Sequence, residues 1–112
     1  MGFVALDDGQ LMPDDTVPVY RFLNTAINSH LFTAFENEKE HLLAQPSFIF
    51  EGIAFYAYSS KSTSTSPVYR FFDIEKGGHF FTANEIEKDH VVNIEQFRYE
   101  GEAFYAFLDF NL

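Results

Sequence analysis

Eight side chains in this sequence could bind a ligand, and they fall into four pairs whose members lie 49 residues apart. Tyrosine offers an aromatic face with a hydroxyl at its tip, and histidine, asparagine and aspartate add hydrogen-bonding groups. Such a set can stack on a sugar ring and bind its hydroxyls, so we expect carbohydrate or cell-surface recognition. The candidate ligand-binding residues are Tyr20, Asn24, His30, Tyr56, Tyr69, Asp73, His79 and Tyr105. Two weak sites would gain affinity by avidity if both reach one surface.

Two arginine–glutamate pairs recur at the same spacing and predict structural ion pairs. Arg21 and Glu51 lie on neighbouring candidate strands, and so do Arg70 and Glu100. A partly buried guanidinium can bind a carboxylate through two hydrogen bonds and thereby fix the register of two strands. The alternative interpretation places the same four charges on the polar floor of a ligand pocket.

The histidines do not form a pattern typical of a metal centre. His30 and His79 each begin a candidate strand, and no second histidine or carboxylate lies at a ligand-like spacing near them. We therefore expect a structural role first, a ligand contact second, and no metal. His41 and His90 could approach these strands only if each helix folds back. We expect no cofactor, although the acidic composition leaves calcium-dependent folding open as an alternative.

Motifs for catalysis are missing from the sequence. It contains no cysteine, no Gly-x-Ser-x-Gly, no phosphate-binding loop and no His-Glu-x-x-His. Glu36, Glu38 and Glu40 belong to the exposed start of a predicted helix, whereas the paired carboxylates of glycosidases need a cleft. We therefore expect that the protein is not an enzyme.

Composition excludes several classes of partner. The chain has 112 residues, a formal net charge of −10 and only 7 Lys and Arg, whereas nucleic-acid phosphates favour clustered basic residues. No apolar run approaches the ~20 residues of a membrane span, so we expect no membrane insertion. Residues 1–4 show no charged and apolar leader, so we expect no signal peptide in this chain. Without disulfides, the 15 Phe and 6 Tyr must provide stability by packing.

The sequence contains the same pattern twice. Residues 18–58 (the first segment) and residues 67–107 (the second segment) align without a gap, and 20 of the 41 positions are identical. A unit of this size rarely buries enough surface to fold alone, so we expect the two repeats to share one aromatic-rich core. We predict a single domain over residues 1–112, with an N-terminal strand and acidic loop at 1–17 and a polar linker at 59–66.

The residue pattern of each segment predicts two strands, then a helix, then a third strand. Alternating residues indicate strands at 19–22 and 30–33 in the first segment. Thr33 lies three residues before Glu36, and Thr82 three before Glu85, so we predict a capping box at each helix start. An aromatic-rich run at 48–58 predicts the last strand, with a bulge or close backbone contact at its glycine. The predicted fold class is α+β, built from two pseudo-symmetric β-β-α-β repeats. We also expect residues 3–6 to add a strand beside the first segment.

Four short motifs, PVYRF, H-x-FTA, E-x-EK and EG-x-AFYA, occur in both segments. Together they resemble a bacterial extracellular tandem-repeat domain of unknown function, often found beside calcium-binding repeats or secreted hydrolases. The resemblance implies an extracellular or cell-surface location and an accessory role, and it supplies no reaction. Asn24 and Ile53 match the pattern of that family, whereas Asp73 and Glu102 depart from it at the corresponding positions of the second segment.

Two classes of function follow from these observations. The first is a non-catalytic secreted binding module for a glycan or another cell-surface component. The second is a structural or protein-interaction domain that acts in assembly or as a spacer, including self-association through edge strands. Exposed tyrosines lining a groove would favour the first class, and a flat apolar patch would favour the second.

Overall fold

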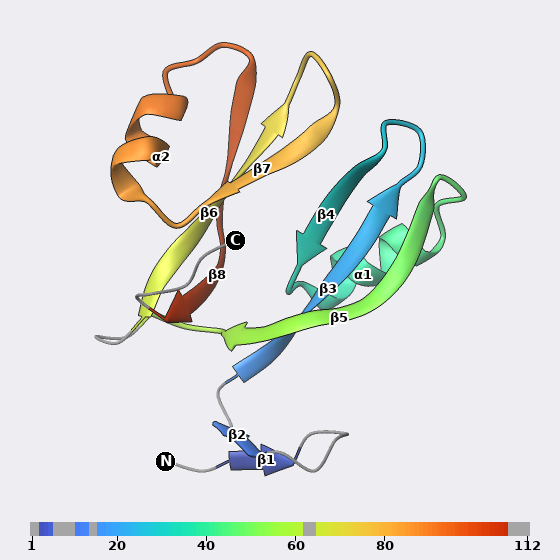
Figure 1. The fold of residues 1–112 in the computed structure, drawn as a ribbon, viewed down its shortest axis with the longest axis vertical. Coiled ribbons are helices and arrows are strands. Elements are labelled where there is room, and N and C mark those ends of the chain that lie inside the picture. The colour runs from blue at the N-terminus through green and yellow to red at the C-terminus, as the bar shows by residue number, and fades with distance from the viewer. Residues whose placement is uncertain (1–2, 6–10, 14–15, 62–64, 108–112) are drawn as a thin grey trace.

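The computed structural model describes residues 3–5, 11–13, 16–61 and 65–107. Its main feature is a six-stranded antiparallel sheet with the strand order β4-β3-β5-β8-β6-β7 (Figure 1). The strands of this sheet are β3 Thr16–Asn24, β4 Ser29–Thr33, β5 Phe48–Tyr58, β6 Thr65–Asp73, β7 Gly78–Thr82 and β8 Phe97–Phe107. Helix α1 (Glu36–Leu43) connects β4 to β5, and helix α2 (Glu85–Val91) connects β7 to β8.

The predicted α+β class, with two β-β-α-β repeats around one core, is wrong, and the fold is mainly β. Strands account for 56% of the structure and helices for 17%. The helices have only 8 and 7 residues, and each buries one side chain, Leu42 or Val91. In contrast, β5 and β8 each reach 11 residues. Gly52 and Gly101 adopt a positive φ in them, which lets each strand continue through a bulge.

The sheet consists of two three-stranded parts that meet along β5 and β8. In the first part β3 pairs with β4 and β5, and in the second β6 pairs with β7 and β8. The two parts join through the pair Tyr58 and Tyr105, and Figure 1 shows them set at an angle. Strands β6, β7 and β8 begin 49 residues after β3, β4 and β5, respectively. Residues of the two segments can therefore be compared position by position.

Apolar packing is divided among three clusters, which corrects the expectation of one shared core. The middle cluster joins the two segments and contains Val19, Ala57, Val68, Ala103, Phe104 and Ala106. One further cluster lies in each segment, formed by Phe22, Leu31 and Leu42 in the first and by Tyr69, Phe71 and Val91 in the second. Phe32 meets Phe81 edge to face between the segments, with ring centroids 5.6 Å apart.

The predicted N-terminal strand does not join the main sheet. β1 (Phe3–Ala5) pairs with β2 (Leu11–Pro13) in a separate two-stranded sheet, with Phe3 opposite Pro13. β2 follows β1 by only a few residues, so this local hairpin takes the place of the predicted pairing with the first segment. Residue 6, which belonged to the predicted strand, lies outside the described residues.

Both predicted capping boxes are also wrong. Helix α1 follows Phe35, which provides no side-chain cap, and α2 follows Asn84, whose side chain accepts a hydrogen bond from Glu87 N at 3.0 Å. Thr33 and Thr82 are the buried last residues of β4 and β7. Their hydroxyls accept hydrogen bonds from Phe35 N and Asn84 N at 3.1 and 3.0 Å, so they shape the turn that enters each helix.

Candidate functional site

Bulges in the two long strands bring each glutamate beside the arginine of the neighbouring strand. Arg21 of β3 lies opposite Glu51 and Gly52 of β5, because the register shifts beside it. The register of β6 against β8 also shifts, next to Arg70, and leaves Glu100 as the extra residue. An extra residue bends the strand that contains it, so the side chain at the bulge points in a different direction from that of a regular strand residue. In both segments the glutamate thereby reaches the arginine of the neighbouring strand.

Arg70 binds carboxylates from both segments. Its Nε donates a hydrogen bond to Glu100 Oε1 at 2.9 Å, and its two Nη atoms donate to the two oxygens of Glu38 at 2.7 and 3.0 Å. Glu38 belongs to α1, so this fork joins the helix of the first segment to the sheet of the second. The Arg70 side chain is only 11% exposed. Charge-assisted, bidentate hydrogen bonds in such a place form a strong polar link between the segments.

Hydrogen bonding outweighs burial in setting the charges of this link. Burial alone would lower the pKa of Arg70 and raise the pKa of Glu38. Their mutual hydrogen bonds and opposite charges reverse both effects, so the pKa of Arg70 is raised and the pKa of Glu38 is lowered. Both groups are therefore charged at neutral pH.

His79 lies beside this pair as a neutral ring. Its Nε2 is 3.2 Å from Glu100 Oε1, and the Phe72 ring packs against it with a centroid distance of 5.3 Å. Burial lowers the pKa of His79, and the negative charge of Glu100 opposes this shift without cancelling it. In the neutral imidazole Nε2–H donates to the Glu100 carboxylate, which leaves Nδ1 as a hydrogen-bond acceptor.

The corresponding cluster of the first segment is exposed. Arg21 Nε donates to Glu51 Oε1 at 3.0 Å, and His30 Nε2 lies 3.0 Å from the same oxygen. The side chains of Arg21 and His30 are 45% and 48% exposed, whereas those of Arg70 and His79 are 11% and 18% exposed. Within the described part of the chain, no helix gives Arg21 the second carboxylate that α1 gives to Arg70.

A cleft lies between the turn that connects β3 to β4 and the turn that connects β6 to β7. It consists of two adjoining cavities of about 330 and 210 Å³, which share Ile27, Ser29, Gly77, Gly78 and His79. Asn24 and His30 also line the smaller cavity, and Asp73 lines the larger one. The structure therefore brings together four of the eight predicted ligand residues, two from each segment.

Side-chain hydrogen bonds fix the turns on either side of this cleft. Asn24 Oδ1 accepts a hydrogen bond from Ala26 N at 3.1 Å, and Asp73 Oδ1 accepts from Glu75 N and Lys76 N, both at 3.0 Å. The hydrogen bond from Lys76 N is the largest cause of the lowered pKa of Asp73. Asp73 is thus a charged anchor of its turn, and the cleft is bordered by turns of defined shape.

The two turns approach each other closely at Gly78. This glycine has a φ of +147°, and a Cβ placed there would lie 3.0 Å from Ser29 Oγ. A side chain at this position would be strained by the backbone conformation, and the Ser29 hydroxyl would have to move away from it.

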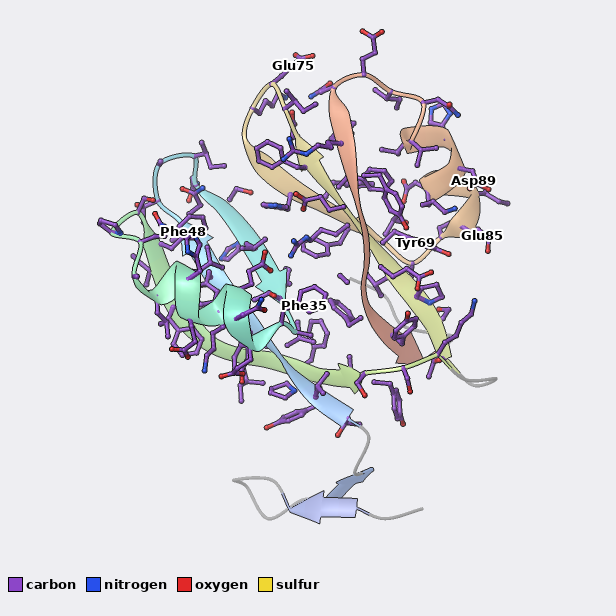
Figure 2. The ribbon with its side chains drawn as sticks, turned by 180° about the vertical axis from the view of Figure 1, so that it is seen from behind. Phe35, Phe48, Tyr69, Glu75, Glu85 and Asp89 are labelled. Atoms are coloured by element: carbon purple, nitrogen blue, oxygen red, sulfur yellow. The ribbon has the colours of Figure 1, made fainter. Side chains whose placement is uncertain are left out.

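The tyrosine candidates do not share the cleft. Tyr20 and Tyr105 each donate their hydroxyl to a nearby glutamate, at 3.1 and 2.6 Å. Tyr69 is buried, and Tyr56 is half-buried in β5. Tyr105 lines a separate cavity of about 260 Å³ between the segments, next to Phe35, which Figure 2 shows at the start of α1. The four rings therefore do not form one stacking platform.

Sequence reasoning missed Glu38 and the small and apolar residues of the cleft. Glu38 carried a signal, because the E-x-EK motif retains it in both segments, but its position in an acidic helix start suggested a solvated residue. Its partner Arg70 lies 32 residues away, and only the packing of the segments brings the two together. Ile27 and Ser29 carried no signal, because the turn sequences of the two segments differ.

The described residues contain no group of three or more His, Asp or Glu side chains that could hold a metal ion. None of the described helices has the length and apolar character needed to cross a membrane.

Comparison with known proteins gives one family. The family model described as "Domain of unknown function (DUF5648)" matches residues 4–107, which include both segments and every residue of the cleft. No curated protein and no solved structure matches the chain.

Proposed function

The chain belongs to the DUF5648 family of domains of unknown function, and we propose that it is a non-catalytic module that binds a carbohydrate in the cleft between its two turns. The observation that carries the proposal is the convergence of Asn24, His30, Asp73 and His79 on two adjoining cavities. These side chains provide an amide, a carboxylate and two imidazoles, which can bind the vicinal hydroxyls of a sugar.

The size and lining of the cleft favour a single sugar unit. Cavities of about 330 and 210 Å³ fall at or below the lower end of the usual range for drug-sized ligands, roughly 300–1,000 Å³. Phe80 and Phe97 line the larger cavity, and Phe72 lines the smaller one. Such rings can pack against the C–H face of a sugar while the polar residues bind its edge.

Charge favours a neutral sugar over an acidic one. Asp73 is ionised and lines the larger cavity, and the chain carries a formal net charge of −10. Both features repel anionic ligands. Because both cavities are only partly enclosed, we expect weak binding of one sugar, with a Kd of about 1 mM.

A glycan array probed with multivalent protein, linked as a tetramer so that sites of millimolar affinity are detected by avidity, tests this proposal with two matched tryptophan variants. Ile27 lines both cavities, whereas Ile74, in the second turn, lines neither, and the two residues are 39% and 54% exposed. Ile27→Trp should fill the cleft and abolish binding, and Ile74→Trp should bind like the wild type. An array without any bound glycan, or equal binding by Ile27→Trp and the wild type, would contradict the proposal.

A structural or protein-interaction role is the second candidate, and exposed apolar residues of β5 favour it. Phe50 and Ile53 are 43% and 45% exposed and lie on the same face of β5, opposite Phe22 and Tyr20 of β3. The second segment carries Glu102 at the position of Ile53. Exposed apolar side chains close together typically mark a surface that a partner covers. Ile53→Glu should abolish binding of such a partner and leave glycan binding unchanged, which separates the two candidates.

We place the module outside the cell as part of the same proposal. Its four motifs resemble a domain found in secreted and cell-surface proteins, and a glycan ligand is available there. Detection of the native protein only in the cytoplasmic fraction of its host would contradict this location.

A further inference from the structure

One face of the first segment is exposed, although the corresponding face of the second segment is largely covered. Arg21 and His30 are 45% and 48% exposed, and their counterparts in the second segment are 11% and 18% exposed. Ala54 is exposed too, whereas its counterpart Ala103 is only 5% exposed. The sequence is the same at these positions, so the difference arises from what covers them.

The first segment itself covers the face of the second. Glu38 of α1 binds Arg70, and Phe32 of β4 packs against Phe81 of β7. Figure 2 shows Phe35 at the start of α1, and this residue lines a cavity together with Ala103 of β8. The start of α1 and the edge of its sheet therefore form a docking surface that fits the Arg–Glu–His face of a segment.

The start of α2 is the counterpart of the start of α1 and is exposed to solvent, whereas Phe81 of the edge strand β7 already packs against Phe32. Glu87 of α2 is the counterpart of Glu38 and is exposed, and no cation pairs with it among the described residues. Ile86, its neighbour in α2, is 82% exposed. An apolar side chain with this exposure on an acidic helix is typical of a surface that another molecule covers.

We propose that a second copy of this chain docks head to tail on the exposed face. Glu87 of one copy binds Arg21 of the next, as Glu38 binds Arg70 within the chain. Charge complementarity at this contact and the intramolecular contact between identical motifs identify the occupant. The contact joins different surfaces of the two copies, so it is heterologous and generates a ring or an open chain. This contact is separate from the cleft and does not depend on the proposed glycan binding.

Charge reversal separates this contact from general electrostatics. Arg21→Glu puts a carboxylate opposite Glu87, and Glu87→Arg puts a cation opposite Arg21, so each variant alone should lose association. An equimolar mixture of the two variants restores opposite charges at every contact, and so does the double variant. Salt dependence alone would not be decisive, because added salt also screens the repulsion between acidic copies.

Sedimentation velocity from about 1 μM to 1 mM provides the readout. The average sedimentation coefficient of the wild type should rise with concentration, because copies associate. Each single variant should stay monomeric to at least about tenfold higher concentration. The mixture of the two variants should associate again like the wild type. Lys61→Glu and Glu75→Arg are controls that make the same charge changes at exposed positions. Figure 2 labels Glu75 at the tip of its turn. Both controls should associate like the wild type.

Three results would overturn the proposal: a wild type that remains monomeric over the whole range, single variants that associate like the wild type, or a mixture that does not recover. Glu87→Arg alters an exposed helix position and leaves the Arg21–Glu51 pair intact. It therefore keeps the test valid if Arg21→Glu lowers the stability of the first segment.

Discussion

Replacing Arg70 by methionine should destabilise the protein far more than the same replacement at Arg21. Arg70→Met removes the cation from Glu38 and Glu100, whose side chains are only 28% and 21% exposed. Breaking a buried ion pair by removing one partner costs about 3–5 kcal/mol, and the residual exposure reduces this to about 2–4 kcal/mol. Arg21 is 45% exposed, so Arg21→Met should cost less than about 1 kcal/mol.

Urea unfolding followed by circular dichroism measures both free energies. The slope of the unfolding free energy against urea should be equal in the wild type and both variants, so that the midpoints report stability. In thermal melts, each 1 kcal/mol corresponds to about 4–8 °C in a domain of this size. Arg70→Met should therefore melt at least about 4 °C below Arg21→Met.

A second substitution tests whether unpaired charge is the cause. Glu38→Gln in the Arg70→Met background removes one of the two carboxylates left without a cation. It should recover about 1 kcal/mol or more, a coupling typical of residues in direct contact. Equal destabilisation by Arg70→Met and Arg21→Met, or additive effects of Glu38→Gln and Arg70→Met, would refute the reasoning.

Three further measurements test the packing and the titration of the fold. Burial lowers the pKa of His79 below its usual 6.5, so the unfolded chain binds a proton first and the unfolding free energy should fall as the pH drops below about 6.5. In His79→Gln this part of the pH profile should flatten, and an unchanged profile would contradict the assignment. Gly78→Ala should cost about 1–3 kcal/mol in urea melts, because alanine is strained at its φ and its Cβ meets Ser29 Oγ; an unshifted midpoint would disprove this. Leu42→Ala should cost about 2–5 kcal/mol, whereas Leu43→Ala, in the same helix but 49% exposed, should stay within about 0.5 kcal/mol.

Local patterns in the sequence located most strands, because they depend on neighbouring residues. The predicted strands at 19–22 and 30–33 lie within β3 and β4, and the predicted strand at 48–58 coincides with β5. The glycine at position 52 predicted a bulge, and its φ of +92° lies beside the register shift of β3 against β5. No Cβ contact occurs within 4 Å of Gly52, so backbone conformation is the reason for glycine there.

The fold class was mispredicted because helix signals were given too much weight. The Thr33–Glu36 spacing suggested a capping box, but Thr33 is the last residue of β4 and binds Phe35 N. The resulting helix is only two turns long and buries Leu42 alone. Length and burial decide the class, and neither follows from a capping motif.

The site was only partly predictable, because its geometry depends on the packing of two segments. The identical motifs pointed to both histidines and both arginine–glutamate pairs, but they implied equal roles in the two segments. In the structure Arg70 binds Glu38 and is only 11% exposed, whereas Arg21 lacks this helix partner and is 45% exposed. The gathering of Asn24 and Asp73 at one cleft likewise requires the turns to meet, which no local pattern encodes.

The central claim is that the cleft between the turns binds a sugar, and amide chemical shifts test it most directly. A ¹H–¹⁵N correlation spectrum of the labelled protein is recorded with increasing concentrations of glucose, galactose and N-acetylglucosamine. At least one sugar should shift the amides of Asn24, Ser29, Gly77, Gly78 and His79 in a saturable manner, with smaller changes elsewhere. Saturable shifts confined to other residues, or no saturable shift with any of the three sugars, would contradict the claim.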